Sequence, residues 1–351
     1  MAKLSPDAIR ALRAENPKPR ARDFAEMQGI TEADLVAAHI SHGVTALVAD
    51  PDRLVPWIGK LGDVMALTRN DNCVHERRGR YSDYRTGSFA AMVLDPEIDL
   101  RIFPNHWVHA FAVEEAGEDG PKRSLQVFDA AGDAVHKVHL KPESLHDQFA
   151  PLIRALRNPV QAQTLDLATR RPVEDAKGSV EDAQALRAAW DKMTDTHQFL
   201  GLVKEHKMNR LGSYRAAGAP YVERLDPYAV TATLEAAALA AIPVMIFVGN
   251  MGCIQIHGGP IEKIVPMGPW INVMDPRFNL HLRADRIAEA YRVWKPTRTG
   301  DVYSVEAFDA RGELILQIFG YRKNTPAEPW NALTHALPRL DVSQPLEEVS
   351  A

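Results

Sequence analysis

Hydrophobic residues recur at helical spacing in two regions of the chain. Residues 7–16 and 31–39, and later residues 182–193 and 197–208, place apolar side chains three or four positions apart, which predicts helices. Short apolar runs separated by turn residues follow each pair, and this pattern predicts strands. Helices followed by a series of strands indicate an α+β fold whose sheet is mostly antiparallel.

The same order of elements occurs twice because the chain repeats itself. Residues 64–138 align with residues 244–318 without a gap, with 17 identities in 75 positions. The identities include glycine, proline, aspartate and cysteine, among them the pair Cys73 and Cys253. We therefore predict a tandem structural duplication, in which each copy is a mostly antiparallel β-sheet preceded and flanked by helices.

Domain boundaries follow from this repeat. We expect a first copy over residues 1–157, a polar linker over 158–178 and a second copy over 179–325. Several prolines lie beyond that point, so residues 326–351 are predicted to be an extended tail.

Composition and charge exclude several classes of protein. The chain has 351 residues, of which 46% are hydrophobic and 25% charged, and its formal net charge is -5. These values are typical of a globular protein and carry no signature of nucleic-acid binding. Two cysteines exclude a disulfide-dense scaffold and a four-cysteine zinc site. We see no signal peptide or membrane helix, and we expect a cytoplasmic protein that is not embedded in a membrane.

His197 is the first candidate for chemistry. On one continuous helix it shares the apolar face that runs from Leu186 to Leu200. Alternatively, Asp195 caps a new helix with Gln198 three residues on, and His197 lies in its first turn. In either arrangement we expect the imidazole to point towards an apolar surface. Such a histidine is either a hydrogen-bonded core residue or a ligand of iron through a neutral ring nitrogen.

Two predicted strands carry further candidates. Residues 99–103 alternate so that Arg101 and Phe103 share one face. Arg101 forms either a surface salt bridge or part of a pocket wall that offers fixed donors to a bound oxygen or anion. A strand over residues 316–322 places Gln317, Phe319 and Tyr321 on one face in the same way. The other cations of interest are Arg210, Lys295 and Arg322, each of which alone would be read as a solvated surface charge.

The chain resembles the HemS/ChuS/HmuS family of hemin-degrading and heme-handling proteins of the bacterial cytoplasm. The resemblance covers nearly all of residues 10–325 and includes the duplication. The segments that carry it are VMALTRNDNCVHERRGRY (64–81), LDPEIDLRIFPNHW (94–107), MTDTHQF (193–199), VWKPTRTGDVYSVEAFD (293–309) and LQIFGYR (316–322).

The resemblance implies a role for each candidate. His197 matches the proximal ligand of the heme iron, and Arg101 matches the distal arginine, with Phe103 beside it. The family has tyrosine where this chain has Phe319, so a propionate hydrogen bond is missing there unless Tyr321 replaces it. The positions that meet the propionates and edge of the heme are Arg210, Lys295, Gln317, Phe319 and Arg322.

The repeat also favours one composite heme site. Scaffold residues match between the copies, whereas the candidate site residues differ from their equivalents. The proximal ligand and the propionate contacts would come from the second copy and the distal arginine from the first. The unequal pairs are His197 with Arg22, Arg101 with His281, Lys295 with Glu115 and Gln317 with Lys137.

Two functions are compatible with this site. The first, which we favour, is a heme oxygenase-like enzyme that degrades imported heme with an external electron donor and releases iron. The second is a carrier that passes intact heme to another protein. Arg101 does not distinguish them, because its cation could stabilise negative charge that develops during oxidation or hold a water molecule in transit. An inner-membrane heme ABC transporter or a downstream heme acceptor is the partner that the resemblance implies.

Overall fold

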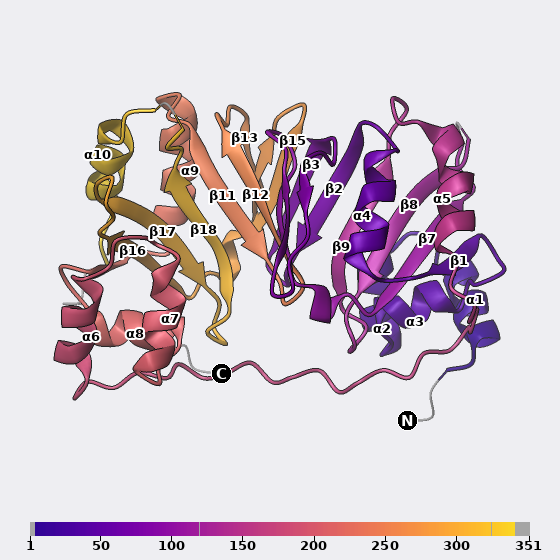
Figure 1. Cartoon of the computed structure of the whole chain (residues 1–351), viewed down its shortest axis with the longest axis horizontal. Coiled ribbons are helices and arrows are strands. Elements are labelled where there is room, and N and C mark those ends of the chain that lie inside the picture. Colours follow the sequence, from indigo (N-terminus) through magenta and orange to yellow (C-terminus); the bar gives the residue numbers. More distant parts are fainter. Residues whose placement is uncertain (1–3, 119, 324, 341–351) are drawn as a thin grey trace.

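The structure is a computed structural model that describes residues 4–118, 120–323 and 325–340. The first half of the chain begins with helices, as the hydrophobic periodicity predicts, and continues with strands (Figure 1). Its helices are α1 (Pro6–Glu15), α2 (Ala21–Gln28), α3 (Glu32–Ala37), α4 (Pro51–Gly59) and α5 (Phe149–Leu156). Its strands are β1 (Val44–Leu47), β2 (Val64–Arg69), β3 (Cys73–Gly79), β4 (Tyr84–Arg85), β5 (Ala91–Leu94), β6 (Asp99–Ile102), β7 (His109–Glu115), β8 (Lys122–Phe128) and β9 (Ala134–Leu140).

The second half repeats this order. Its helices are α6 (Ala183–Trp190), α7 (Gln198–Glu205), α8 (Arg210–Ala217), α9 (Ala229–Leu239) and α10 (Glu328–Ala336). Its strands are β10 (Val222–Leu225), β11 (Val244–Gly249), β12 (Cys253–Gly259), β13 (Ile264–Met267), β14 (Trp270–Met274), β15 (Phe278–Arg283), β16 (Glu289–Lys295), β17 (Val302–Phe308) and β18 (Leu314–Gly320).

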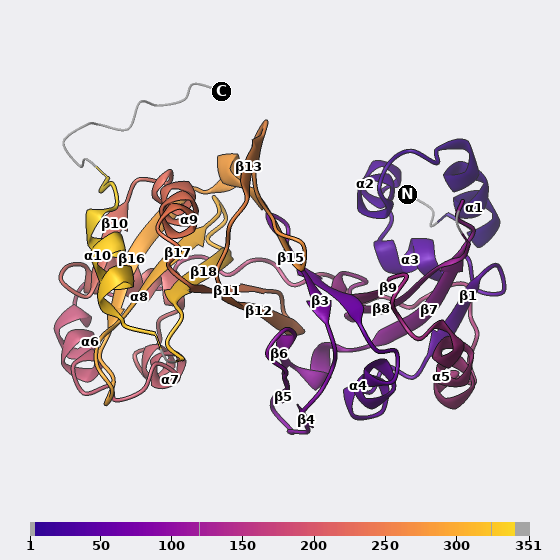
Figure 2. The same cartoon turned by 90° about the horizontal axis from the view of Figure 1, so that it is seen from above.

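The two copies exchange strands. One nine-stranded sheet has the order β1-β7-β8-β9-β2-β3-β15-β14-β13, and the other has the order β10-β16-β17-β18-β11-β12-β6-β5-β4. We call them sheet A and sheet B. Sheet A therefore ends in three strands of the second half, and sheet B ends in three strands of the first half (Figure 2). The prediction of a duplicated, mostly antiparallel α+β fold is confirmed, and the exchange of strands is a feature that the prediction did not contain.

Two asparagines at equivalent positions of the repeat, Asn70 and Asn250, help to hold the two halves together. Asn70 Oδ1 accepts from the backbone N–H of Cys73, and Asn250 Oδ1 does the same for Cys253, at 2.9 and 3.0 Å. Each asparagine amide then donates to backbone carbonyls of the opposite half, such as Ile315 for Asn70 at 2.8 Å. The same type of side chain closes a turn in its own copy and hydrogen-bonds to the other copy. This double role explains why asparagine stands at this position in both copies.

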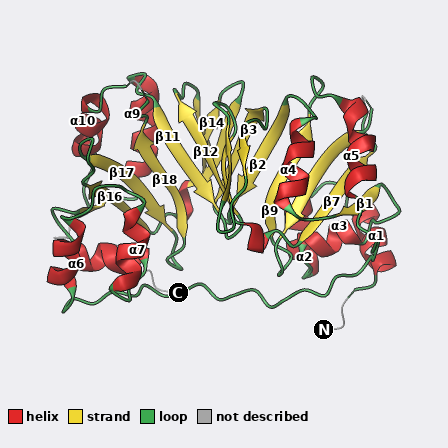
Figure 3. Cartoon of the chain, viewed as in Figure 1, coloured by secondary structure: helices red, strands yellow, loops and turns green. Residues whose placement is uncertain are grey.

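Helices cover the sheets from both sides (Figure 3). In the first half, α4 and α5 pack against one face and α3 packs against the opposite face of sheet A. In the second half, α9 and α10 lie on one face of sheet B, and α6 to α8 lie on the opposite face. The core under α4 and α5 includes β5 and β6, and the core under α9 and α10 includes β14 and β15. Each core is therefore built from both halves.

Helices α3 and α8 begin in equivalent ways. Thr31 caps α3 through a hydrogen bond from the Asp34 N–H to its hydroxyl oxygen at 3.0 Å. Asn209 caps α8, because its side-chain oxygen accepts from the Gly212 N–H at 2.9 Å. These caps place residues 32 and 210 at the first position of each helix, facing the sheet beneath.

The ends of the copies differ from the expectations. Residues 158–182 run along the molecule without a helix or strand, and Gln161 and Gln163 tie this segment to the first half (Figure 1). The expectation of an extended tail from residue 326 fails over Glu328–Ala336, which form α10 with Trp330 buried. The physical reason is that Pro329 occupies the first turn of this helix, where proline is tolerated. Residues 341–351 of the expected tail lie outside the described residues.

None of the helices in the described ranges has the length and apolar composition that a bilayer crossing requires.

Candidate functional site

The candidate residues of the two predicted strands share one face of sheet B. Gln317 on β18 lies opposite Phe247 on β11, and Arg101 on β6 lies opposite Ile254 on β12. Directly opposed residues in antiparallel strands point to the same side of the sheet. Following the register from strand to strand places Arg101 on the same side as Gln317. A residue of the first half thus joins the face formed by the second half.

This face is apolar in its middle, where the buried Ile256 lies beside the half-buried Phe247. Phe247 and Phe319 meet edge to face with ring centroids 5.1 Å apart. The neighbouring side chains on β11 and β12 are apolar, and glycine completes both strands. We call this surface the open face of sheet B, and its residues are Met245, Phe247, Gly249, Ile254, Ile256, Gly258, Gln317, Phe319 and Arg101.

His197 lies immediately before α7 and its side chain is 90% exposed. The structure therefore corrects the expectation that the imidazole points towards an apolar surface, and it excludes a core histidine. The helical face breaks because α6 ends at Trp190 and α7 starts anew at Gln198. The arrangement resembles the second of the two predicted ones, with Gln198 Oε1 accepting from the Thr194 N–H at 2.8 Å.

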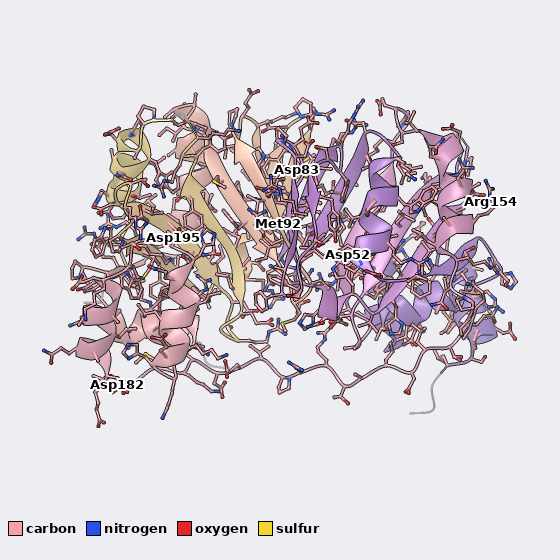
Figure 4. The ribbon with its side chains drawn as sticks, in the orientation of Figure 1. Asp52, Asp83, Met92, Arg154, Asp182 and Asp195 are labelled. Atoms are coloured by element: carbon pink, nitrogen blue, oxygen red, sulfur yellow. The ribbon has the colours of Figure 1, made fainter. Side chains whose placement is uncertain are left out.

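Asp195 orients the His197 ring. Its Oδ1 atom lies 2.6 Å from His197 Nδ1 and accepts from the His197 backbone N–H at 2.8 Å. These two hydrogen bonds lower the pKa of the Asp195 carboxyl. With Nδ1 engaged, Nε2 is the ring nitrogen left for a ligand. Figure 4 labels Asp195 over the second half and Met92, the cross-strand neighbour of Arg101, near the middle of the molecule.

Arg101 is partly exposed and paired locally. Its Nη1 atom donates to Asp99 on the same strand and to the Leu100 carbonyl, the latter at 3.1 Å. Burial raises the pKa of Asp99, and the Arg101 charge opposes that shift. Phe103 follows β6, where its N–H donates to Gly252 of the second half at 3.0 Å and its ring lies 6.1 Å from that of Phe89.

Lys295 and Arg210 share a counter-ion. Lys295 Nζ and Arg210 Nη1 each donate to the Glu306 carboxylate at 3.1 Å, and Tyr214 donates to it at 2.7 Å. Burial alone would raise the pKa of Glu306, but the two cations lower it to about 2. Both cations also lie against the Phe199 ring, with Lys295 Nζ 4.7 Å from its centroid. Because Phe199 belongs to α7, this cluster joins the helix that follows His197 to the sheet.

The end of β18 carries the remaining predicted residues. Phe319 occupies the open face, as the strand alternation predicts. Tyr321 lies beyond it, and its ring packs over Gly258, where a Cβ atom would come within 2.9 Å of the tyrosine. Arg322 is exposed and donates to Thr299 Oγ1 at 2.6 Å. The structure thus places Gln317, Phe319 and Tyr321 together at the end of β18, with Arg322 exposed at the edge of this group.

The equivalent face of sheet A is closed by its own charges. Glu32, the first residue of α3, accepts from Lys137 Nζ at 2.7 Å and forms an ion pair with Arg69. Burial would raise the pKa of Glu32, but these cations lower it to about 2. Lys137 is the repeat equivalent of Gln317, and Glu32 holds the same first position in α3 that Arg210 holds in α8. A carboxylate of the protein therefore sits between the helix and the sheet in the first half.

Several residues of the site were not found from the sequence. Phe247, Glu306 and Phe199 were missed, although Phe199 stands in the segment that contains His197. The repeat comparison could have found two of them, because Phe247 and Glu306 face Leu67 and Gln126 in the first copy. The same criterion of unequal equivalents had selected Arg101 and Gln317.

Fold and site together define a class of protein: a duplicated α+β chain with an open apolar face on sheet B that carries an arginine of the first half and adjoins a buried cation cluster. A family model described as the haemin-degrading HemS.ChuX domain matches residues 29–156 and again residues 207–337. The chain belongs to this family. Arg101, Lys295 and Gln317 fall within the matched ranges, whereas His197 falls between them.

Two curated relatives cover most of the chain. The hemin transport protein HemS of Yersinia enterocolitica is 38% identical over 311 residues, which are 88% of this chain and 90% of the relative. The hemin transport protein HmuS of Yersinia pestis is 37% identical over the same shares.

Solved structures agree with this fold. Holo-PhuS, a heme-binding protein from Pseudomonas aeruginosa, is 42% identical, covers 96% of this chain and 100% of its own, and superposes with a TM-score of 0.91. ChuS, an E. coli heme oxygenase, is 31% identical, covers 94% of this chain and 99% of its own, and gives a TM-score of 0.84.

Proposed function

We propose that this protein binds heme on the open face of sheet B, with His197 as the ligand of the iron, in the bacterial cytoplasm. The observation that carries the proposal is that Arg101 of the first half shares this face with Gln317 and Phe319 of the second half. β11 and β12 separate β18 from β6, a span of about 14 Å at roughly 4.8 Å per strand. A flat macrocycle can bridge that span.

The chemistry of the face suits heme. Phe247, Phe319 and Ile254 offer apolar surface to the plate, and burying that surface yields about 25 cal/mol per Å². The Asp195 carboxylate would hold the His197 ring so that Nε2 meets the iron, a common support for histidine ligands. Arg210 and the Gln317 amide would donate charge-assisted hydrogen bonds to the propionate carboxylates. Phe199, two residues after His197, contacts both cations, so the proposed ligand and the cation cluster lie at the same end of α7.

We further propose that the bound heme is a substrate that the protein degrades with an external electron donor, releasing iron. Arg101 is the group that supports this step, because a guanidinium beside the iron stabilises negative charge that develops there. The similarity to ChuS, an E. coli heme oxygenase, supports the same conclusion.

The test begins with a hemin titration of the purified protein followed by absorption spectroscopy. A histidine-ligated spectrum is expected, and its absence would reject the proposed site. Hemin-loaded protein is then given reductant and oxygen with catalase present. Loss of the Soret band together with an open tetrapyrrole product supports degradation, whereas loss only without catalase shows that free peroxide did the chemistry.

Transport of intact heme is the second candidate function. It is favoured by the similarity to two hemin transport proteins. A carrier should pass hemin to an acceptor at a rate that increases with acceptor concentration. A rate that is independent of the acceptor would count against it.

A further inference from the structure

Glu306 is a fully buried carboxylate beside the open face, and it lies next to the buried Lys295. Its carboxylate accepts hydrogen bonds from Lys295, Arg210, Tyr214 and Ser304, at 3.1, 3.1, 2.7 and 2.8 Å. Both of its oxygens are therefore saturated by donors. A carboxylate held in this way is ionised at neutral pH.

Two cations and one carboxylate leave a single positive charge in this cluster. Lys295 is buried beneath Phe199 and is out of reach of a ligand in this structure. The Arg210 side chain is 21% exposed. All the side-chain hydrogen bonds of Arg210 to described residues leave from Nη1, so its other donors remain for an anion that arrives from outside. Glu306 and any carboxylate of the ligand would consequently compete for the hydrogen bonds of Arg210.

The first half shows the opposite arrangement of the same parts. There the carboxylate, Glu32, comes from the helix and covers the sheet cations Lys137 and Arg69. In the second half the helix supplies the cation Arg210, and the carboxylate lies behind it on β17. A carboxylate behind the cation attracts it towards the sheet, whereas a ligand draws it outwards. The second half thus combines an accessible cation with an internal competitor.

We propose that Glu306 limits how tightly the site holds the carboxylates of its ligand, because it competes with them for Arg210. This inference rests on the proposed binding of heme, whose two propionates are the carboxylates concerned. Glu306 does not touch the ligand in this arrangement and acts through Arg210 as a positioning residue. Its consequence is faster release, which a protein that delivers heme or discharges a product requires.

The test measures release of hemin from loaded protein to excess apomyoglobin by absorption. Glu306→Gln removes the competing charge and keeps the shape, so hemin should leave about 10-fold more slowly, since a charge-assisted hydrogen bond contributes on the order of a factor of ten in affinity. The dimethyl ester of hemin has no ionised carboxylates. Its release should be the same from both proteins.

Two further variants complete the design. Glu306→Gln leaves Lys295 and Arg210 without their shared counter-ion and could impair folding, so the double variant Glu306→Gln with Lys295→Met removes one charge of each sign. Replacing a buried ion pair by groups of similar volume is commonly tolerated, and release should again be slower.

Glu289→Gln is the matched control, because Glu289 also ties α8 to the sheet through Arg215 but does not contact Arg210. Its release rate should equal that of the unchanged protein.

Three results would overturn the inference. These are release from the double variant at the unchanged or a faster rate, equal slowing of hemin and of its ester, and slowing by Glu289→Gln. If the unchanged protein binds no hemin, the proposed function itself fails and this inference falls with it. If it binds hemin and the variants release it normally, only the inference about Glu306 is wrong.

Discussion

His197 is presented at a helix start with its ring almost completely exposed, yet it is not free to rotate. Asp195 binds both its backbone N–H and Nδ1, so one carboxylate fixes the main chain and the ring together. A ligand of a metal needs this kind of support, since a neighbouring carboxylate orients the imidazole and raises its basicity.

His197→Ala should therefore remove the histidine-ligated spectrum of hemin. The apolar face and Arg210 would remain, so weaker binding without that spectrum is expected. The measurement is a hemin titration in the visible range. His206→Ala is the control, because His206 is the nearest histidine along the chain and ends the same helix. An unchanged spectrum for His197→Ala would show that another residue binds the iron.

Arg101→Ala should spare binding and slow oxidation. Among the described residues its guanidinium hydrogen-bonds to Asp99 and the Leu100 carbonyl, so its loss should leave the apolar face intact. Removing one preorganised donor that stabilises developing charge lowers rates by about 100-fold or more. The rate of reductant-dependent Soret loss measures this, with the hemin affinity measured on the same sample. Equal losses of affinity and rate would instead make Arg101 a binding residue.

At the scale of elements, the two helix starts that face the sheets carry opposite charges and have different consequences. Arg210 opens the second half to an anion, whereas Glu32 closes the first half. The ion pairs of Glu32 also join α3 to β2 and β9, which makes this carboxylate part of the scaffold.

Glu32→Gln should consequently destabilise the protein. Removing one partner of a buried ion pair leaves the others unneutralised and costs roughly 3–5 kcal/mol. Urea unfolding followed by circular dichroism gives the change in the free energy of unfolding. Glu143→Gln is the control, because the Glu143 carboxylate pairs with Arg78 but is 62% exposed, and exposed pairs contribute about 1 kcal/mol or less. A similar loss for both variants would contradict the argument.

Much of the fold was accessible from the sequence, because helical periodicity, strand alternation and the repeat all have local signatures. The exchange of strands was not. β6 and β15 are repeat equivalents, and so are β3 and β12, so the hydrophobic pattern allows each strand to pair within its own copy or across. Only the turn lengths and the joint around Asn70 and Asn250 distinguish these pairings, and they act over long sequence distances.

The candidate site was predicted unevenly for a related reason. Arg101, Gln317 and Phe319 lie on strands, where alternation fixes the face, and the structure places all three on one side. His197 was assigned to an apolar face because the spacing was followed through a break between α6 and α7. A break between two helices changes the direction in which the following side chains point. The spacing of residues before the break therefore does not predict which face the residues after it occupy.

At the scale of the whole molecule, the two halves meet around a buried polar network. Thr68 of the first half donates to Gln255 of the second at 2.9 Å, and Gln255 Nε2 lies 2.8 Å from His75 Nδ1. His136 lies 2.8 Å from Thr68 and 2.5 Å from the Tyr81 hydroxyl. Both histidines are excluded from water. Burial lowers the pKa of both histidines, so they are neutral at neutral pH.

This network should make the protein sensitive to acid. Burial lowers the pKa of His136 to about 3, against an ordinary value of 6.5. The unfolded chain therefore binds more protons between these values, so the stabilising contribution is complete above pH 6.5 and is lost as the pH falls towards 3. Between pH 6.5 and pH 5 one such histidine should cost about 2 kcal/mol.

Urea unfolding at pH 7 and pH 5 measures this loss. His136→Gln should reduce the difference between the two pH values by about 2 kcal/mol, whatever its effect at pH 7. His42→Gln is the control, since His42 is exposed and should leave the pH dependence unchanged. An undiminished pH dependence in His136→Gln would place the acid sensitivity elsewhere.

Duplication supplied two sheets with two comparable faces, but their charges differ, and we expect only the open face of sheet B to take an anionic plate. On sheet A the place of Arg210 is taken by Glu32, the place of Gln317 by Lys137 and the place of Phe319 by His139. An entering propionate would meet a carboxylate that already occupies the cations, and the plate would meet a polar surface.

We therefore expect one hemin per chain in a titration at concentrations well above the dissociation constant. Arg101→Ala should leave that ratio at one and His197→Ala should abolish the ligated species. Two equivalents with equal spectra would mean that the first half also binds hemin iron and that the charges of sheet A do not close its face to the ligand.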